Sequence, residues 1–351
     1  MREKSGCRNA RPVGATHERD KRVRRSVANQ AEPHLCYSKP MELSMDTYTN
    51  CNLCPRQCGA RRTDGKAGTC GCDARLRVAR SALHYWEEPP ISGEAGSGAI
   101  FFSGCPLKCV FCQNHQISHE GTGIEVSTDR LAHMMLELEQ QGALNINLVT
   151  PMHYAPHVAR AAKRARAMGL SLPFVCNTSG YELDSLIRAF DGTIDIWLTD
   201  FKYASAAVAK ELSGAGDYPA VAKRALQEML LSLRRHGGRQ LADDGAMLRG
   251  IIVRHLVLPA HVEDSCAVLD MVWDMCQNEV DLSVMNQYTP NERCRDAGGP
   301  LSHSLSEEEY ELVLCHADDL GFEHLWWQQG GTVSESFVPA FDATGVLEPA
   351  F

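Results

Sequence analysis

The chain has 351 residues, a length that suits one large domain, or one domain with a smaller appendage, and allows a sizeable buried core. Its formal net charge of −9 is uneven, because residues 1–30 carry nine Lys or Arg and three Asp or Glu, a net of +6, which leaves −15 for the remainder. A body this acidic argues against a nucleic-acid-binding surface. No apolar run approaches the length of a membrane span, which argues against an integral membrane protein.

The distribution of cysteine narrows the class of protein further. The chain has 15 cysteines, and eight of them lie between Cys51 and Cys112. Clustered cysteines in an enzyme-sized chain without a recognisable signal peptide indicate metal binding in a reducing compartment, and not a disulfide framework. The sequence therefore predicts a cytoplasmic metalloprotein.

Residues 1–45 show neither helical nor strand periodicity and are rich in Arg, Lys and small polar residues. The basic run at residues 21–25 is compatible with a nucleic-acid-binding arm or a targeting sequence. The composition favours a disordered tail, or an upstream extension with the true start at Met41 or Met45. We predict no function for this segment.

Residues 46–97 are predicted to form a metal-binding appendage and a linker. Four cysteines have the spacing C-x2-C-x3-C-x11-C, namely Cys51, Cys54, Cys58 and Cys70. Four thiolates can close a tetrahedral site, so a structural zinc is the economical prediction, with Cys72 as a spare ligand. A second iron–sulfur cluster is the alternative, since thiolates alone do not distinguish the metals, and a reduced loop without metal is the third interpretation. Prolines and glycines in residues 87–98 indicate a shaped linker.

Residues 98–325 alternate apolar runs with amphipathic stretches. Strands are predicted at residues 99–103, 145–150, 172–176, 194–199, 250–258 and 281–288. Helices are predicted at residues 128–141, 155–168, 182–190, 219–235, 262–277 and 306–320. Six βα units in series require a parallel sheet with right-handed crossovers. We therefore predict an α/β fold, a partial (β/α)6 barrel with its active face at the carboxyl ends of the strands, followed by a tail at residues 326–351.

The loop after the first predicted strand carries three cysteines at spacing C-x3-C-x2-C, and these are Cys105, Cys109 and Cys112. Three thiolates on one short loop can ligate three irons of a [4Fe-4S] cluster and leave the fourth iron open to an external ligand. A structural zinc site would normally need a fourth protein ligand. A zinc knuckle, or three unrelated buried thiols, is the alternative.

Polar residues follow the other predicted strands, at the edge where a barrel carries its chemistry. The candidates for a cofactor site are Thr150, Asn177, Ser179, Asp200, Lys202 and Gln287. The fifth strand contributes Arg254 and His255 at the same edge. Each residue alone is explained by a loop or helix cap, because Asn, Asp and Ser favour turns. Their joint occurrence at successive strand ends favours a common site.

The C-x3-C-x2-C spacing, with Phe111 before the third cysteine, resembles the radical S-adenosylmethionine (SAM) superfamily. In that superfamily the open iron chelates the amino and carboxylate groups of SAM, and an electron from the reduced cluster cleaves SAM to methionine and a 5'-deoxyadenosyl radical. The radical then abstracts hydrogen. The resemblance implies a [4Fe-4S] cluster, SAM as cofactor, and an electron donor such as flavodoxin or ferredoxin.

Several strings narrow the resemblance to a family of uncharacterised proteins that carry the name of pyruvate formate-lyase-activating enzymes. They include Cys-Asn-Leu-Cys-Pro-Arg-Gln-Cys, Glu-Glu-Pro-Pro-Ile-Ser-Gly, Val-Phe-Cys-Gln-Asn, Asn-Thr-Ser-Gly-Tyr-Glu, Asp-Phe-Lys-Tyr and Asn-Gln-Tyr-Thr-Pro, and the match runs from about Cys51 to about Tyr288. The family name implies hydrogen abstraction from a glycine of a protein substrate. Modification of another protein, a small molecule or RNA is the alternative, as is a non-catalytic iron–sulfur or zinc scaffold.

One departure from the glycyl-radical activases bears on this name. Those enzymes carry Gly-Gly-Glu at the end of the second strand, where it helps to hold the SAM amino group, and this chain has Val149-Thr150-Pro151 there. The stretch Asp200-Phe201-Lys202 does resemble their Asp-Leu-Lys. We therefore expect Thr150 and residues 177–179 to supply the polar contacts of the replaced motif.

Overall fold

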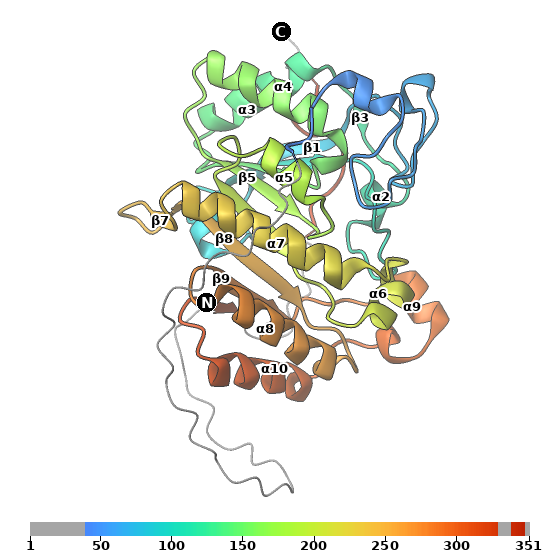
Figure 1. Ribbon diagram of the computed structural model, residues 1–351, viewed down its shortest axis with the longest axis vertical. Helices are drawn as coiled ribbons and strands as arrows, with labels where there is room; N and C mark the ends of the chain where they lie inside the picture. Colours follow the sequence, from blue (N-terminus) through green and yellow to red (C-terminus); the bar gives the residue numbers. More distant parts are fainter. Residues whose placement is uncertain (1–38, 329–337, 348–351) are drawn as a thin grey trace, which may run out of the picture.

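The structure is a computed structural model and describes residues 39–328 and 338–347 (Figure 1). Its strands are β1 (Arg77–His84), β2 (Ser97–Phe102), β3 (Ile124–Glu125), β4 (Ile146–Val149), β5 (Phe174–Thr178), β6 (Ile196–Asp200), β7 (Gln240–Leu241), β8 (Met247–Leu256), β9 (Asp281–Met285) and β10 (Leu325–Trp327). Its α-helices are α1 (Pro89–Ser92), α2 (His115–Ser118), α3 (Thr128–Gln140), α4 (Ala155–Ala167), α5 (Asp184–Ala189), α6 (Ala206–Ser213), α7 (Tyr218–Arg235), α8 (Val262–Cys276), α9 (Glu292–Ala297) and α10 (Glu307–Leu320). Short 3-10 helices are η1 (Met45–Tyr48), η2 (Arg62–Asp64), η3 (Met152–Tyr154) and η4 (Pro300–Ser302).

The strands form one sheet in the order β10-β9-β8-β6-β5-β4-β2-β1-β3, with β7 paired to β8. From β2 to β10 all neighbours on this path are parallel, whereas β1 runs antiparallel to both β2 and β3. At the two ends of the path, β3 and β10 pair with no further strand among the described residues. The sheet is therefore not closed, and the predicted partial α/β barrel is confirmed.

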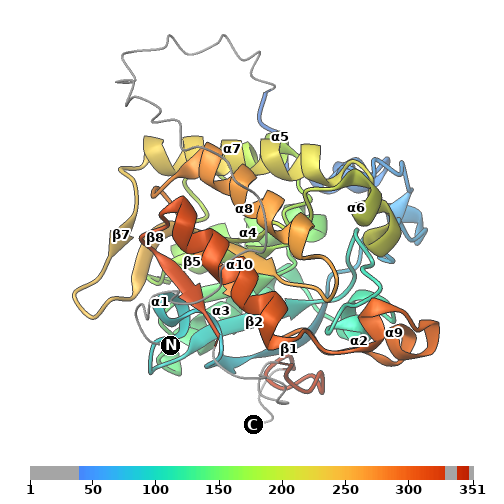
Figure 2. The same ribbon diagram turned by 90° about the horizontal axis from the view of Figure 1, so that it is seen from below.

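The outer face of the sheet carries the main core. Side chains such as Ile100, Leu148, Trp197 and Val253 belong to the same buried cluster as the apolar faces of the long helices. Figures 1 and 2 show α3, α4, α7, α8 and α10 running alongside the sheet. Because successive side chains of a strand point to opposite faces, the residues between these belong to the inner face.

The inner face changes from apolar to polar along the strands. Val175, Ile196, Leu198 and Ile252 form a small buried cluster there. Two residues further on, β5, β6 and β8 present Asn177, Asp200 and Arg254 to the same face, by the alternation of side chains. The carboxyl ends of the parallel strands are therefore polar on the side that the helices do not cover.

All six predicted strands and all six predicted helices are present, with ends that differ by a few residues. The sequence does not predict β3, β7 and β10, which are too short to show a period, nor the short helices α1, α2, α6 and α9. It also does not predict β1, because an irregularity in its pairing between Val78 and Arg80 interrupts the alternation of side chains.

Two predicted boundaries need correction. The division between residues 97 and 98 cuts through one sheet, because β1 pairs with β2 along its length, and the predicted linker contains α1. The predicted tail at residues 326–351 begins inside β10, and Val346 is fully buried while Arg130 donates hydrogen bonds to its carbonyl and those of its neighbours. Of the predicted N-terminal extension, residues 1–38 lie outside the described residues, and Met45 begins η1.

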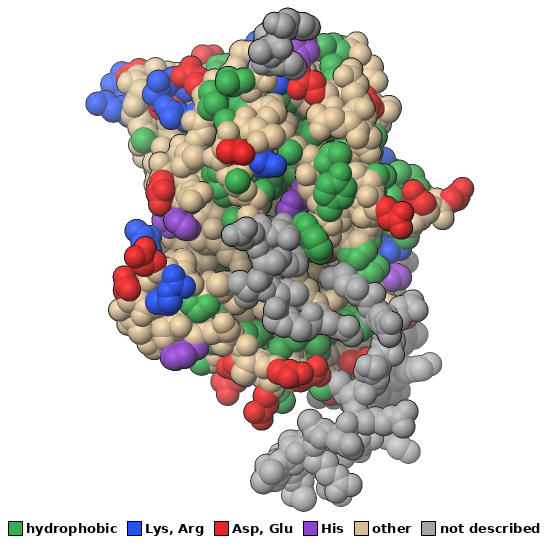
Figure 3. All heavy atoms as spheres, turned by 180° about the vertical axis from the view of Figure 1, so that it is seen from behind, with side chains coloured by type: hydrophobic (Ala, Val, Ile, Leu, Met, Phe, Trp, Pro, Cys, Tyr) green, Lys and Arg blue, Asp and Glu red, His purple; other side chains and the backbone are tan. Residues whose placement is uncertain are grey.

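Two further features, the length of the helices and the charge of the surface, concern membrane spanning and nucleic-acid binding. In the described ranges, none of the helices is both long enough and apolar enough to cross a membrane. On the part of the face in Figure 3 that is not covered by grey atoms, Lys and Arg side chains are interspersed with Asp and Glu side chains.

Candidate active site

The cysteine loop begins directly after β2 and is held in a tight turn. Gly104 has φ +87°, and a side-chain carbon there would lie 2.2 Å from Cys72 Sγ and 2.8 Å from the Cys70 carbonyl oxygen. Only glycine fits this position, because it needs both the left-handed conformation and the missing side chain. The turn brings Cys105, Cys109 and Cys112 to the wall of one cavity of about 210 Å³.

Hydroxyl groups lie close to two of the three sulfurs. Ser213 Oγ lies 2.9 Å from Cys109 Sγ, and it shares a hydrogen bond of 2.6 Å with Tyr203 OH. Ser118 Oγ lies 3.3 Å from Cys112 Sγ. Hydroxyl donors of this kind stabilise a metal-bound thiolate and tune its electron density. The sequence analysis misses both serines, because they come from the ends of short helices that it does not predict.

The inner-face polar residues form a row of alternating charges beside the cysteines. Lys202 Nζ lies 2.5 Å from Asp200 Oδ2, and Arg254 Nε lies 3.0 Å from Asp200 Oδ1. Arg254 also donates to Asn177 Oδ1 at 2.6 Å and reaches Glu87 Oε2 at 3.3 Å. These ionic side chains are between 9% and 19% exposed, so their charges interact strongly with one another.

The charges of this row shift one another's protonation. Burial opposes the ionised forms, but the charges of Lys202 and Arg254 hold the pKa of Asp200 below its ordinary value. Burial likewise opposes the charge on Lys202, and Asp200 outweighs it and raises the pKa of the ammonium. For Glu87, burial outweighs the attraction of Arg254 and raises the pKa of the carboxyl. The pair nearest the cysteines is thus held ionised.

Glu87 is the main residue of the site that the sequence analysis does not identify. It lies in the segment predicted as a linker, and its Oε1 accepts hydrogen bonds from Asn147 Nδ2 at 3.0 Å and Asn177 Nδ2 at 3.3 Å. Asn147 is a fully buried polar residue inside a strand of apolar neighbours. A buried amide of this kind needs a partner, which is the signal that could have indicated a polar inner face.

Every residue predicted for the cofactor site lies on the wall of the same cavity as the three cysteines, namely Thr150, Asn177, Ser179, Asp200, Lys202 and Gln287. Thr150 has φ +58°, a strained conformation for a β-branched residue, and its N–H donates to the Asn177 carbonyl at 2.8 Å. The backbone carbonyl of Gln287 accepts a hydrogen bond from Gln113 Nε2 at 2.5 Å, which fixes its position. The cavity wall also includes His84, the last residue of β1, and Trp86, two residues further along the chain.

The three cysteines fit a cluster better than a single ion. They are three thiols on the wall of one cavity, one fewer than the four protein ligands that a structural zinc site needs. In a [4Fe-4S] cluster each thiolate binds its own iron, so three cysteines leave the fourth iron without a protein ligand. The donor set therefore suits a cluster with one open iron.

The second set of cysteines, the N-terminal cysteine segment (residues 51–72), packs on the cluster loop. The Cys105 N–H donates to the Cys70 carbonyl with 3.1 Å between the atoms. Arg56 Nε donates to the Pro106 carbonyl at 3.0 Å, and Cys72 Sγ lies 3.3 Å from the Ser103 carbonyl oxygen. Direct contacts of this kind pack the segment against the cluster loop, although residues 51–72 are not part of the cavity wall.

The four predicted ligands of this segment also lie near one another. A side-chain carbon at Gly68 would lie 3.1 Å from Cys58 Sγ and 3.6 Å from Cys70 Sγ. Burial, with a smaller contribution from the negative charges of Cys70, Cys51 and Cys58, raises the pKa of the Cys54 thiol to about 12. Cys51, Cys54, Cys58 and Cys70 therefore occupy one region, although they do not converge on a single ion position.

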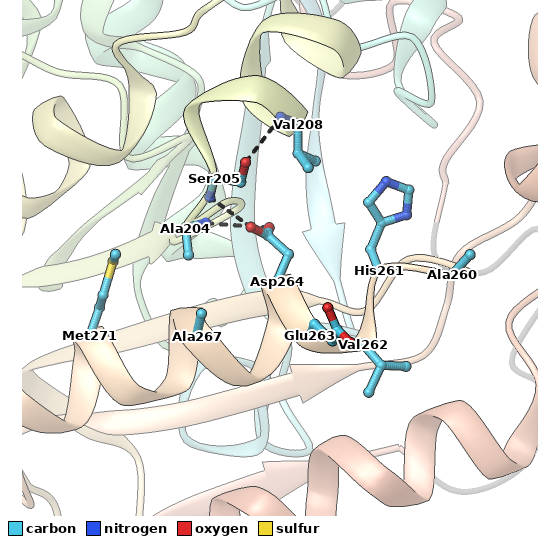
Figure 4. A pocket seen from close by; sticks show the side chains of 10 residues that line it. All are labelled: Ala204, Ser205, Val208, Ala260, His261, Val262, Glu263, Asp264, Ala267 and Met271. Atoms are coloured by element: carbon cyan, nitrogen blue, oxygen red, sulfur yellow. Dashed lines mark hydrogen bonds between the residues drawn. The ribbon is translucent and has the colours of Figure 1, made fainter.

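A larger, more open hollow of about 790 Å³ lies elsewhere, between the amino ends of α6 and α8 (Figure 4). Its central carboxylate, Asp264, accepts hydrogen bonds from the backbone N–H groups of Ser205 at 2.6 Å and Ala204 at 3.3 Å. Ser205 Oγ in turn accepts from the Val208 N–H. These bonds fix the start of α6, so the polar groups have a structural role, and the smaller cavity holds the candidate chemistry.

Comparison with known proteins gives a family match over part of the chain. Residues 99–232 match the family model described as the radical SAM superfamily. The uncharacterized protein MJ0674 of Methanocaldococcus jannaschii is 25% identical over 295 residues, which cover 82% of this chain and 79% of that protein.

Two solved structures share a low level of similarity. One is Streptococcus suis SuiB bound to its precursor peptide SuiA, with 12% identity, a TM-score of 0.43 and coverage of 64% of this chain and 46% of that one. The other is a radical SAM methyltransferase from Sphaerobacter thermophilus, with 10% identity, a TM-score of 0.44 and coverage of 67% of each chain. The matched region thus spans about half the length of the first.

Proposed function

We propose that this chain is a radical SAM enzyme that binds SAM at a [4Fe-4S] cluster held by Cys105, Cys109 and Cys112, supported by the match of residues 99–232 to the radical SAM superfamily. Three protein thiolates leave one iron free to bind the cofactor. When bound, cluster and SAM together supply the chemistry of the superfamily, a one-electron cleavage that yields methionine and a 5'-deoxyadenosyl radical for hydrogen abstraction.

The observation that carries the proposal is a single cavity of about 210 Å³ whose wall includes the three thiols and the polar ends of the parallel strands. A site at the carboxyl ends of barrel strands is where this architecture carries its chemistry. The sequence alone predicts the three cysteines and the polar residues at the strand ends, but not that the two sets lie close together. Their common cavity supports one site in which cofactor and cluster meet.

The residues of the chain would bind and orient the cofactor. Lys202 is a buried cation near the cysteines and suits a carboxylate, while Asp200 fixes its position through the 2.5 Å ion pair. Asn177, Ser179 and Thr150 offer amide and hydroxyl groups for amino and ribose groups. Because the ionic side chains are mostly buried, water is largely excluded, which protects a reactive radical.

The test of this proposal against a non-catalytic iron–sulfur or zinc scaffold is spectroscopic. The anaerobically reconstituted and reduced protein is titrated with SAM, and its electron paramagnetic resonance (EPR) spectrum is followed. SAM that binds the open iron changes the spectrum of the cluster, because the ligand set of that iron changes. A spectrum that SAM leaves unchanged contradicts the proposal and favours the scaffold.

For the substrate, we propose the activation of a glycyl-radical protein as the first candidate, supported by the resemblance of Asp200-Phe201-Lys202 to the activases. Modification of another protein or of a small molecule is the second candidate, and Val149-Thr150-Pro151 in place of Gly-Gly-Glu favours it. The net charge of −15 outside residues 1–30 disfavours RNA. Loss of a backbone glycyl hydrogen, detected as a glycyl radical by EPR in a partner protein, separates the two.

Two further parts of the proposal concern partners and metals. Reductive cleavage needs an electron that the described side chains do not supply, so we propose a low-potential donor such as flavodoxin or ferredoxin, in the cytoplasm. We also propose a second metal centre, zinc or iron–sulfur, at Cys51, Cys54, Cys58 and Cys70, supported by their location in one region.

A further inference from the structure

The N-terminal cysteine segment encloses a buried positive charge. Arg62, in η2, is 1% exposed and ranks among the largest fully buried side chains of the molecule. Its guanidinium carbon lies 4.3 Å from the centre of the Tyr48 ring and 5.5 Å from that of Tyr154. Charged groups are seldom buried this completely unless an opposite charge compensates them.

The guanidinium nitrogens of Arg62 all donate hydrogen bonds, but the positive charge of the group is not compensated by a carboxylate among the described residues. Nε and Nη2 donate to the Asp73 carbonyl at 3.0 and 2.8 Å, and Nη1 donates to the His153 carbonyl at 2.7 Å. Within the described ranges, no Asp or Glu side chain forms an ion pair with Arg62. The remaining contact is from Nη1 to Cys51 Sγ, at 3.7 Å. Carbonyl groups satisfy the donors, but neutralisation of the charge requires an anion.

Thiolates are the anions that this location offers. Four thiolates around a [4Fe-4S] core in its oxidised form, or around zinc, carry a net charge of about −2. Such a centre beside Arg62 compensates the buried cation and in turn receives a hydrogen bond at one of its sulfurs. Building on the second centre proposed above, we infer that Cys51, Cys54, Cys58 and Cys70 hold an iron–sulfur cluster and that Arg62 is its fixed counter-charge.

The contact with the SAM-binding loop favours iron–sulfur over zinc. The Cys105 N–H donates to the Cys70 carbonyl at 3.1 Å, so the segment lies directly beside the proposed SAM-binding cluster. SAM cleavage consumes an electron, and an iron–sulfur centre can pass one on, whereas zinc has no redox chemistry. Zinc is the alternative that the metal analysis tests.

The fifth thiol of the segment has a different role. Cys72 Sγ lies 3.3 Å from the Ser103 carbonyl oxygen, and a side-chain carbon at Gly104 would lie 2.2 Å from it, so this sulfur packs on the turn that precedes Cys105. With Cys70 as the fourth ligand the set is complete, which makes Cys72 a matched control.

The identity of the metal is tested in the full chain that lacks the other cluster. In the triple variant Cys105→Ala, Cys109→Ala and Cys112→Ala, anaerobically purified and reconstituted, we expect about four iron and about four sulfide per chain. A further Cys70→Ala change should remove them, whereas Cys72→Ala should not. Zinc without sulfide, no metal, or equal loss in both variants overturns the inference.

The wild-type protein gives an independent measurement if the triple variant does not fold. A cluster with four protein ligands has no open iron, so its reduced EPR signal should not change when SAM is added. About eight iron per chain and one SAM-insensitive signal support the inference. About four iron per chain overturns it. A wild type with both clusters whose signals SAM leaves unchanged contradicts the proposed function alone.

The role of Arg62 is tested by measuring the reduction potential of the SAM-insensitive cluster. A fixed positive charge stabilises the reduced, more negative cluster, so Arg62→Gln should shift the midpoint to a lower potential. Arg62→Lys keeps the charge and should shift the midpoint less. Identical midpoints in the wild type and both variants, with full iron content, overturn the assignment of Arg62.

Discussion

The N–H of Cys105 donates a hydrogen bond to the carbonyl of Cys70, with 3.1 Å between the nitrogen and the oxygen. One residue is a proposed ligand of the SAM-binding cluster, and the other is a proposed ligand of the second metal centre. The two sets of cysteines are therefore joined through the backbone, although 34 intervening residues separate them in the chain. Because the bond joins two backbone groups, replacement of the cysteine side chains leaves both of its partners in place.

Replacement of Cys109 by Ala removes one of the three ligands of the SAM-binding cluster. A cluster held by two thiolates is labile, so we expect loss of the iron and sulfide of that site and loss of 5'-deoxyadenosine formation. The measurement is anaerobic iron and sulfide analysis with product chromatography. The control is Cys276→Ala, because Cys276 is also buried but lies in α8, outside the cavity wall. Formation of 5'-deoxyadenosine by the Cys109→Ala protein would contradict the assignment of Cys109 as a cluster ligand.

Replacement of Lys202 by Ala tests the polar side of the cavity. If the ammonium holds the cofactor carboxylate, the lost charge-assisted bond is worth roughly 1.5–3 kcal/mol, which weakens SAM binding by about one to two orders of magnitude. An anaerobic SAM titration measures this. Lys210→Ala in α6, a lysine outside the cavity wall, is the control. Unchanged affinity would return Lys202 to a structural role with Asp200.

The backbone of Thr150 allows a prediction about strain. Its φ of +58° costs a β-branched residue roughly 1 kcal/mol or more, whereas glycine adopts this conformation freely. Thr150→Gly should therefore leave the free energy of unfolding unchanged or raise it by about 1 kcal/mol. Thr178→Gly, in β5 where φ is not positive, should lower it. Chemical denaturation compares the two variants, and equal destabilisation by both refutes the role of strain.

Glu182 gives the fold a predictable dependence on pH. Burial, opposed only in part by hydrogen bonds, raises the pKa of its carboxyl from 4.5 to about 7. The folded protein thus binds this proton more tightly than the unfolded chain, so the stability falls as the pH rises from about 4.5 to about 7.

The full loss attributable to Glu182 is roughly 3 kcal/mol, since one pKa unit corresponds to about 1.4 kcal/mol. Glu182→Gln should remove this part, so the variant gains stability relative to the wild type between about pH 5.5 and about pH 8. Chemical denaturation at both values measures the difference. A difference between the two proteins that does not change with pH is incompatible with the raised pKa.

The sequence predicts the parallel sheet and the cysteine loop well, because both have local signals. The alternating apolar runs indicate six strands, and the spacing of Cys105, Cys109 and Cys112 is contained in one loop. The sequence does not predict Glu87 as part of the site, since its partners Asn147, Asn177 and Arg254 come from three different strands. Ion pairs across a sheet depend on register, which no local pattern specifies.

The position of the N-terminal cysteine segment in the fold is not predictable from the sequence, for the same reason. Its spacing predicts a metal site, but only the fold brings Arg62 between Cys51 and the carbonyl of His153. A buried arginine is indistinguishable in sequence from the exposed arginine beside it. Arg61, its neighbour in the chain, lies on the surface with a side chain 71% exposed.

The most direct test of the central claim is the formation of 5'-deoxyadenosine by the reconstituted wild-type protein with SAM and dithionite under anaerobic conditions. We expect 5'-deoxyadenosine and methionine in equal amounts, and neither product from the Cys109→Ala protein. A wild-type protein that contains its full complement of iron and sulfide but forms no 5'-deoxyadenosine would contradict the assignment of a radical SAM enzyme.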